Sequence, residues 1–132
     1  MTTSQQTQTF TSEQDADRIY EDNVAKVIRA QMGMTPLLML GAQDFTTVRG
    51  NEPGLEFTGR ILPFDKEGTR LRKAEKMKIR IILTPLDEYN ITVTRANGEE
   101  FLALEGIYCF QLAKMMMALD YDGDQVLNPR CI

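Results

Sequence analysis

The chain has 132 residues, of which 42% are hydrophobic and 26% are charged, with a formal net charge of −4. This length fits a single domain of ordinary size, and the small net charge requires neither a strongly basic nor a strongly acidic partner. The absence of histidine excludes Ser-His-Asp and Cys-His catalysis, His-ligated zinc and the usual near-neutral general base.

The N-terminal region predicts a tail followed by a helix. Residues 1–11 are almost entirely Thr, Ser and Gln, and such a segment predicts a flexible polar tail. Ser12 and Asp15 resemble a capping box that opens a helix near 13–31. The domain is expected to span 12–120, followed by an acidic and polar C-terminal tail over 121–132.

Short apolar or alternating runs predict the strands. The linker 50–54, which contains Gly and Pro, predicts a hairpin connection, and Asn97-Gly98 predicts a tight turn. A second helix is expected near 105–119. The predicted fold is α+β, with a mostly antiparallel sheet of about five strands between an N-terminal and a C-terminal helix. The runs that predict strands are 37–40, 45–48, 55–58, 77–83, 89–95 and 101–104.

Three stretches carry a family resemblance: Met39-Leu40-Gly41-Ala42-Gln43-Asp44-Phe45, Arg80-Ile81-Ile82-Leu83-Thr84-Pro85-Leu86-Asp87-Glu88-Tyr89, and Glu105-Gly106-Ile107-Tyr108-Cys109-Phe110-Gln111-Leu112. In this order they resemble small, largely uncharacterised proteins of bacteriophages and related mobile elements. The resemblance covers roughly residues 24–119. This chain departs from the pattern at Leu40, where those proteins have Thr, and in a longer basic insertion around 65–76. The resemblance implies a phage or mobile-element origin and brings no catalytic residue with it.

Residues 60–80 contain eight basic and three acidic side chains, a net charge of +5. Because Lys78 and Arg80 alternate with apolar residues, one face of the strand is cationic and the other enters the core. Such a face could follow the phosphate backbone of single-stranded nucleic acid. The aromatic residues Phe57 and Tyr89 lie either on the same sheet as these basic residues or in the core. A solvated loop and a docking face for an acidic partner remain alternatives. The candidate nucleic-acid-binding residues are Arg60, Arg70, Arg72, Lys73, Lys76, Lys78 and Arg80.

Three consecutive methionines, Met115, Met116 and Met117, occupy the predicted C-terminal helix. Neighbouring residues of a helix point about 100° apart, so at least one of the three should be exposed or lie at an interface. Methionine suits adaptable contact surfaces. The run therefore predicts an interface with a protein partner or with a second subunit, and the alternative is that methionine fills a large core.

Metal-binding and catalytic patterns are weak. Asp120, Asp122 and Asp124 match the start of a calcium loop, but Gln125 stands where the loop needs Gly, and Cys131 where it needs Glu. Cys109 lies in an apolar stretch and is expected to be a core thiol. No phosphate-binding glycine loop is present in the sequence. We therefore expect no metal, no cofactor and no enzymatic activity.

The function expected from these patterns is that of a small non-enzymatic phage or mobile-element binding protein, contacting single-stranded nucleic acid through residues 60–80. The alternative is a protein–protein module, either a host-directed inhibitor or an assembly component, that uses the methionine-rich helix. We expect a homo-oligomer in the host cytoplasm without membrane association, since the sequence contains neither a signal peptide nor an apolar span.

Overall fold

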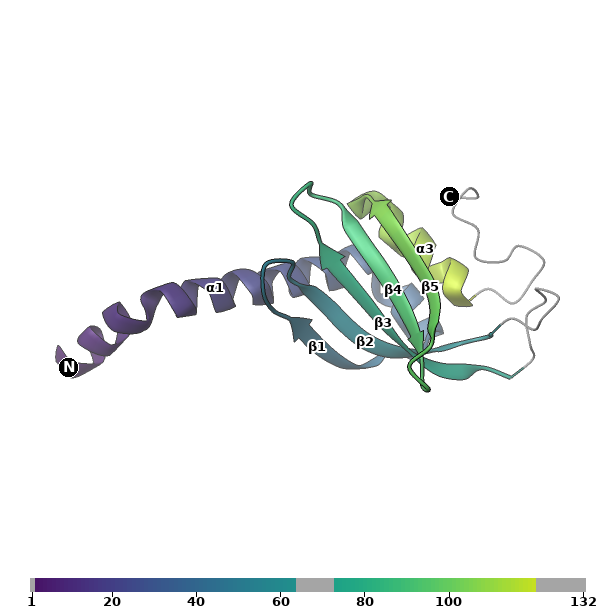
Figure 1. The fold of residues 1–132 in the computed structure, drawn as a ribbon, viewed down its shortest axis with the longest axis horizontal. Helices are drawn as coiled ribbons and strands as arrows, with labels where there is room; N and C mark the ends of the chain where they lie inside the picture. The colour runs from purple at the N-terminus through teal and green to yellow at the C-terminus, as the bar shows by residue number, and fades with distance from the viewer. Residues whose placement is uncertain (1, 64–72, 121–132) are drawn as a thin grey trace.

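The computed structural model describes the backbone of residues 2–63 and 73–120, and the side chains of residues 14–63 and 73–119. Its centre is a five-stranded antiparallel sheet in which consecutive strands are neighbours (Figure 1). This arrangement confirms the predicted α+β fold. The strands are β1 (Gln43–Val48), β2 (Gly54–Ile61), β3 (Glu75–Leu83), β4 (Tyr89–Arg95) and β5 (Glu100–Ile107). The helices are α1 (Thr2–Met32), α2 (Met34–Met39) and α3 (Leu112–Asp120), with a short 3-10 turn, η1 (Cys109–Gln111), before α3.

The core lies between one face of the sheet and the helices. Alternation along β2 and β3 places apolar side chains on this face, where the pairing of Phe57 with Ile79 is fully buried. Helices α1 and α3 both contact β2 on this side. The opposite face of the sheet is covered by none of the described helices, and we call it the open face (Figure 1).

Helix α1 is attached to the body by its C-terminal part. Val24, Ala25, Ile28 and Met32 are buried, whereas residues 14–20 are all exposed. The rest of the helix projects away from the sheet along the long axis of the molecule (Figure 1). It begins at Thr2 rather than near residue 13, so helical backbone also covers most of the 1–11 segment.

A polar clamp fixes α1 to the connection between β1 and β2. Arg49 donates hydrogen bonds of 2.9 and 3.0 Å to Glu21 Oε1 and Asp22 Oδ1, and the Gly50 N–H donates to Glu21 Oε2 at 2.9 Å. The bond from the Gly50 amide and the Arg49 guanidinium lower the pKa of Glu21. Glu21 therefore stays ionised at neutral pH, and the clamp holds the direction in which α1 leaves the body.

The strand predicted over residues 37–40 is wrong, because these residues belong to the end of α2 and its C-cap. The Leu40 N–H donates to the Pro36 carbonyl, a helical i to i−4 bond. Leu37 and Leu40 are buried while Leu38 is 73% exposed, which is the spacing of a helix turn. A four-residue apolar run does not distinguish a buried strand from a short buried helix.

The predicted start of the second helix and the predicted burial of Cys109 are also wrong. Residues 105–107 complete β5, in which Ile107 pairs with Tyr89, and α3 begins only at Leu112. Between them the chain turns at the surface, so Cys109 is exposed and Phe110 is 77% exposed. Asp122 and Asp124 lie outside the described residues. Among the helices of the described part, none is both long and apolar enough to span a membrane.

Candidate nucleic-acid interface

The open face carries a group of basic side chains from β2 and β3. Lys76, Lys78 and Arg80 alternate with the buried Met77, Ile79 and Ile81, and their side chains are 58%, 57% and 53% exposed. The antiparallel register places Arg60, also exposed, directly opposite Lys76. The fold thus gathers four of the predicted basic residues on one surface. We call Arg60, Lys76, Lys78 and Arg80 the cationic face.

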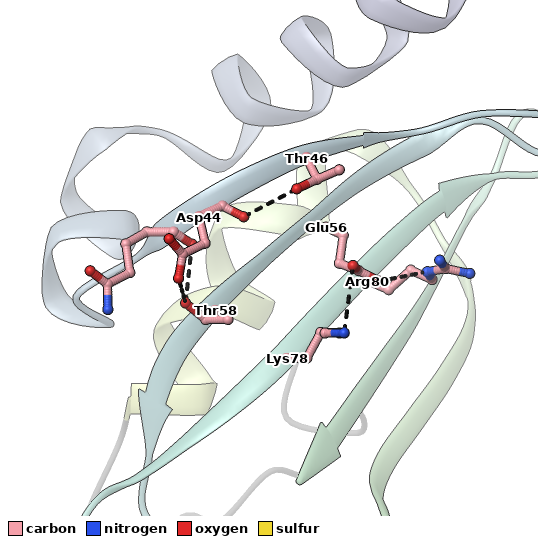
Figure 2. A network of polar contacts seen from close by, with 7 residues as sticks. Asp44, Thr46, Glu56, Thr58, Lys78 and Arg80 are labelled. Atoms are coloured by element: carbon pink, nitrogen blue, oxygen red, sulfur yellow. Dashed lines mark hydrogen bonds and ion pairs between the residues drawn. The ribbon is translucent and has the colours of Figure 1, made fainter. Parts of the chain in front are cut away.

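Acidic residues of neighbouring strands contact this surface (Figure 2). Arg80 Nε donates a 3.0 Å hydrogen bond to Glu56 Oε2, because the register sets the two residues opposite each other. Lys78 Nζ lies 3.8 Å from Glu56 Oε1, and Lys76 Nζ lies 3.7 Å from Asp44 Oδ2. Both lysine distances exceed hydrogen-bond length. Arg80 is therefore engaged by Glu56, whereas the two lysines are only loosely paired.

A hollow of about 300 Å³ opens beside the two lysines. The hydroxyl-bearing residues Thr58 and Thr94 contribute to its wall, together with Arg95 from the end of β4. The ammonium groups of Lys76 and Lys78 beside a shallow recess of this size suit an anion such as a phosphate group, whereas the Thr58 hydroxyl already donates within the sheet. Its full lining is Thr58, Lys76, Met77, Lys78, Thr94, Arg95, Ala96 and Gly98.

The Arg95 side chain lies on the core side of the sheet, since Arg95 pairs with the buried Met77, and there it is bonded to Glu75. Its Nε and NH2 donate to the two carboxylate oxygens of Glu75 at 2.9 and 2.8 Å, which is a bidentate pair. This bond lowers the pKa of Glu75 and raises that of Arg95. Because both groups remain charged at neutral pH, the pair fixes the position of the guanidinium and adds no net charge.

The edge of the sheet next to the hollow is shaped by Asp44 and Thr58 (Figure 2). Asp44 has a φ of 60°, in the left-handed region, at an irregularity in the pairing of β1 with β2. The Thr58 hydroxyl lies 3.1 Å from the Gln43 carbonyl oxygen and 3.3 Å from Asp44 Oδ2. These contacts bring the Asp44 carboxylate to the rim of the cationic face.

The other predicted site residues are distributed differently. Lys73 is exposed just before β3, while Arg70 and Arg72 lie outside the described residues. Phe57 is fully buried and Tyr89 is 5% exposed, so both rings belong to the core and offer no stacking surface on the open face. Of the methionine run, Met115 and Met116 lie in the core of the chain, and Met117 is 44% exposed.

Sequence reasoning missed Glu56 and Asp44, the two acids that contact the cationic face. Glu56 occupies an outward position of β2, which the alternation of that strand indicates, but its contact with Arg80 depends on the register of two strands. In the part of the chain that the structure describes, no group of three or more acidic, Cys or His side chains forms a metal site.

Comparison with protein-family models, with curated proteins and with solved structures finds no match to this chain.

Proposed function

We propose that this chain is a small non-enzymatic binding protein of phage or mobile-element type, whose open face contacts the phosphate backbone of single-stranded nucleic acid. The observation that carries the proposal is the hollow beside Lys76 and Lys78, two exposed lysines that are only loosely paired with acids. Arg60 and Arg80 extend the same surface along β2 and β3.

The energetic cost of exchanging the internal pairs for a phosphate is small. Ion pairs between exposed side chains contribute only about 0–1 kcal/mol, because water and salt screen them. The pair of Lys76 with Asp44 is of this kind; in the pair of Lys78 with Glu56 the lysine is exposed, whereas the glutamate side chain is 21% exposed. A phosphate that approaches the hollow replaces these contacts with shorter ones and releases condensed counterions, which makes binding dependent on salt.

The open face also supports a prediction about selectivity. Stacking on aromatic side chains contributes about 1–3 kcal/mol per base, and the two rings considered from the sequence are buried. Binding should therefore be mainly electrostatic, with a steep dependence on salt and little preference among base sequences.

Fluorescence anisotropy with a labelled oligothymidylate at low and moderate salt tests this proposal. We expect the wild-type chain to bind at low salt, and the double variant Lys76→Ala/Lys78→Ala to lose about 1.4 from the salt slope, since each single-strand phosphate contact contributes about 0.7. Lys114→Ala, which removes one exposed lysine of α3 on the other side of the sheet, is the single-charge control. A loss half as large in this control would show that the effect is one of overall charge.

A second candidate function is binding of another protein. It is favoured by exposed apolar side chains around η1, where the Tyr108 and Phe110 rings stack with centroids 5.7 Å apart and Phe110 is 77% exposed. The test is capture of partners from a host lysate by the wild-type chain and by Phe110→Glu and Met117→Glu variants. A specific partner lost only with Phe110→Glu supports this surface, and identical capture by all three chains contradicts it.

A further inference from the structure

Helix α1 carries an exposed seam that the body of the protein does not use. Ala16, Tyr20, Asn23, Val27 and Ala30 follow each other at alternating spacings of four and three residues, and all five are exposed. Spacings of four and three residues are those of the contact line of a coiled coil. Tyr20 and Val27 are 56% and 48% exposed, and Ile19, which borders the seam, is 61% exposed.

The seam lies on a different side of α1 from the residues that attach it to the body. At about 100° per residue, the buried Val24, Ile28 and Met32 form a line centred more than a quarter-turn away from the seam. The clamp of Arg49 on Glu21 and Asp22 holds the helix in place at the point where burial ends. The seam is therefore presented in a fixed direction by each chain.

The projecting part of α1 lacks the packing that stabilises its attached part, since residues 14–20 are all exposed. Most helical stability in proteins comes from packing of an apolar face. The N-terminal end of α1 is rich in threonine, a residue of low helix propensity, so local propensity contributes little there. A helix that projects from the body in this way (Figure 1) gains stability when its seam is covered.

Charge along α1 identifies what covers it. Residues 13–22 contain five acidic side chains and one basic one, whereas residues 23–32 contain Lys26 and Arg29 and no acidic residue. Two copies of this helix side by side in parallel would place acidic segment next to acidic segment. In the antiparallel arrangement each acidic segment lies beside the basic segment of the other copy, which is electrostatically favourable.

We propose that the α1 seam is the interface of a homodimer, in which the helices of two copies pack antiparallel about a two-fold axis near Tyr20 and Asn23. This arrangement sets Ala16 opposite Val27 of the partner subunit, a small side chain against a larger one. The proposal is independent of nucleic-acid binding, which uses the open face of the sheet.

One ion pair across the dimer follows from the helix geometry. Asp15 and Lys26 are eleven residues apart, close to three helical turns, so they lie along the same flank of the seam. In an antiparallel pair related by a two-fold axis, the flank on a given side of the seam faces the same flank of the partner helix. Asp15 of each copy then approaches the long side chain of Lys26 of the partner subunit.

A recess beside the seam gives room for side chains of the second copy. A hollow of about 320 Å³ is lined by Tyr20, Val24 and Val27 of α1 and by Leu83, Tyr89 and Cys109 of the body, with Asn23, Gln31 and Asp87 completing its wall. Because α1 residues of the seam form one side of this hollow, a helix packed on the seam also covers its opening.

The oligomeric mass of the full chain, measured by light scattering and sedimentation equilibrium over a range of concentrations, tests the dimer. We expect a dimer for the wild-type chain and a monomer for Val27→Glu, whose exposed position leaves the fold intact, as circular dichroism will verify. Leu38→Glu on α2, where the side chain is 73% exposed, is the matched control and should remain dimeric. A monomeric wild-type chain at all concentrations, or a dimeric Val27→Glu, overturns the proposal.

A charge exchange tests the antiparallel register. Asp15→Lys sets like charges together at two symmetric places and should weaken the dimer about tenfold. The double variant Asp15→Lys/Lys26→Asp should restore the wild-type dissociation constant. Failure of the second change to restore association contradicts the antiparallel arrangement.

Discussion

Glu56 contacts two residues of the cationic face, and its replacement tests the proposed phosphate contacts sharply. Its carboxylate accepts a 3.0 Å hydrogen bond from Arg80 and lies 3.8 Å from Lys78 Nζ (Figure 2). Replacing Glu56 with Gln keeps the shape of the side chain and removes the charge. Arg80 is then free to contact phosphate and no carboxylate opposes Lys78, so we expect Glu56→Gln to bind single-stranded nucleic acid more tightly than the wild-type chain.

The magnitude follows from the hydrogen bond that holds Arg80 to Glu56 in the wild-type chain. If Arg80 gains one phosphate contact when this bond is removed, the slope of log affinity against log salt becomes steeper by about 0.7. The cost to the fold is small, since the Lys78 and Arg80 side chains are more than half exposed and exposed pairs contribute about 0–1 kcal/mol. The gain in affinity should be largest at low salt and disappear as salt is raised.

The assay is an anisotropy titration of the same oligothymidylate at several salt concentrations. Glu52→Gln is the matched control, because it makes the same charge change at an exposed position in the connection between β1 and β2. If Glu56→Gln and Glu52→Gln raise affinity equally, the effect comes from net charge, and the assignment of phosphate contacts to Lys78 and Arg80 is wrong.

Three further predictions concern the sheet that presents the site. Gly54→Ala should destabilise the fold by about 1–3 kcal/mol in urea denaturation, because a Cβ there would overlap the backbone of β3 at the Ile81 carbonyl. Phe57→Ala should cost about 3–5 kcal/mol in the same measurement, since the ring is fully buried. Glu75 has a lowered pKa in the fold through its bond from Arg95, so its stabilisation is complete above the unfolded-state pKa of about 4.3 and is lost as pH falls through the folded-state pKa. Urea midpoints measured against pH should therefore fall less steeply in acid for Glu75→Gln than for the wild-type chain.

The outcomes that would contradict these three predictions are distinct. Unchanged stability in Gly54→Ala would mean that β2 and β3 are not in close contact at this point. Phe110→Ala, at a 77% exposed position, is the control for Phe57→Ala. Equal losses of unfolding free energy in the two variants would contradict the burial of Phe57 in the core. If the urea midpoint falls equally in acid for Glu75→Gln and for the wild-type chain, the pair of Glu75 with Arg95 does not stabilise the fold.

Much of the sheet was predictable, because its strands alternate and its turns have clear residue signals. The run from Met77 to Ile81 has the period of a half-buried strand, and Asn97-Gly98 forms the turn between β4 and β5, with Gly98 at a φ of 91°. The strand prediction for residues 37–40 was wrong because four apolar residues are too few to distinguish the period of a strand from that of a helix. Residues 105–107 were assigned to a helix because nothing local marks the end of β5.

The candidate site was predictable only in its cations. Alternation placed Lys78 and Arg80 on one face of a strand, and the structure shows that Arg60, which the sequence also predicted, lies across the register from Lys76. The acids that contact them come from other strands, and their approach depends on pairing that single-strand patterns do not encode. The attachment of helix α1 could not be predicted for the same reason, since Glu21 is bonded to Arg49 in a turn that is distant in the sequence.

The salt dependence of oligothymidylate binding by the wild-type chain tests the proposed function most directly. If Arg60, Lys76 and Lys78 contact phosphate while Arg80 stays bonded to Glu56, log affinity should fall linearly with log salt at a slope of about −2.1, at about 0.7 per contact. No detectable binding at low salt, or a slope near zero, would contradict the assignment of the open face to single-stranded nucleic acid.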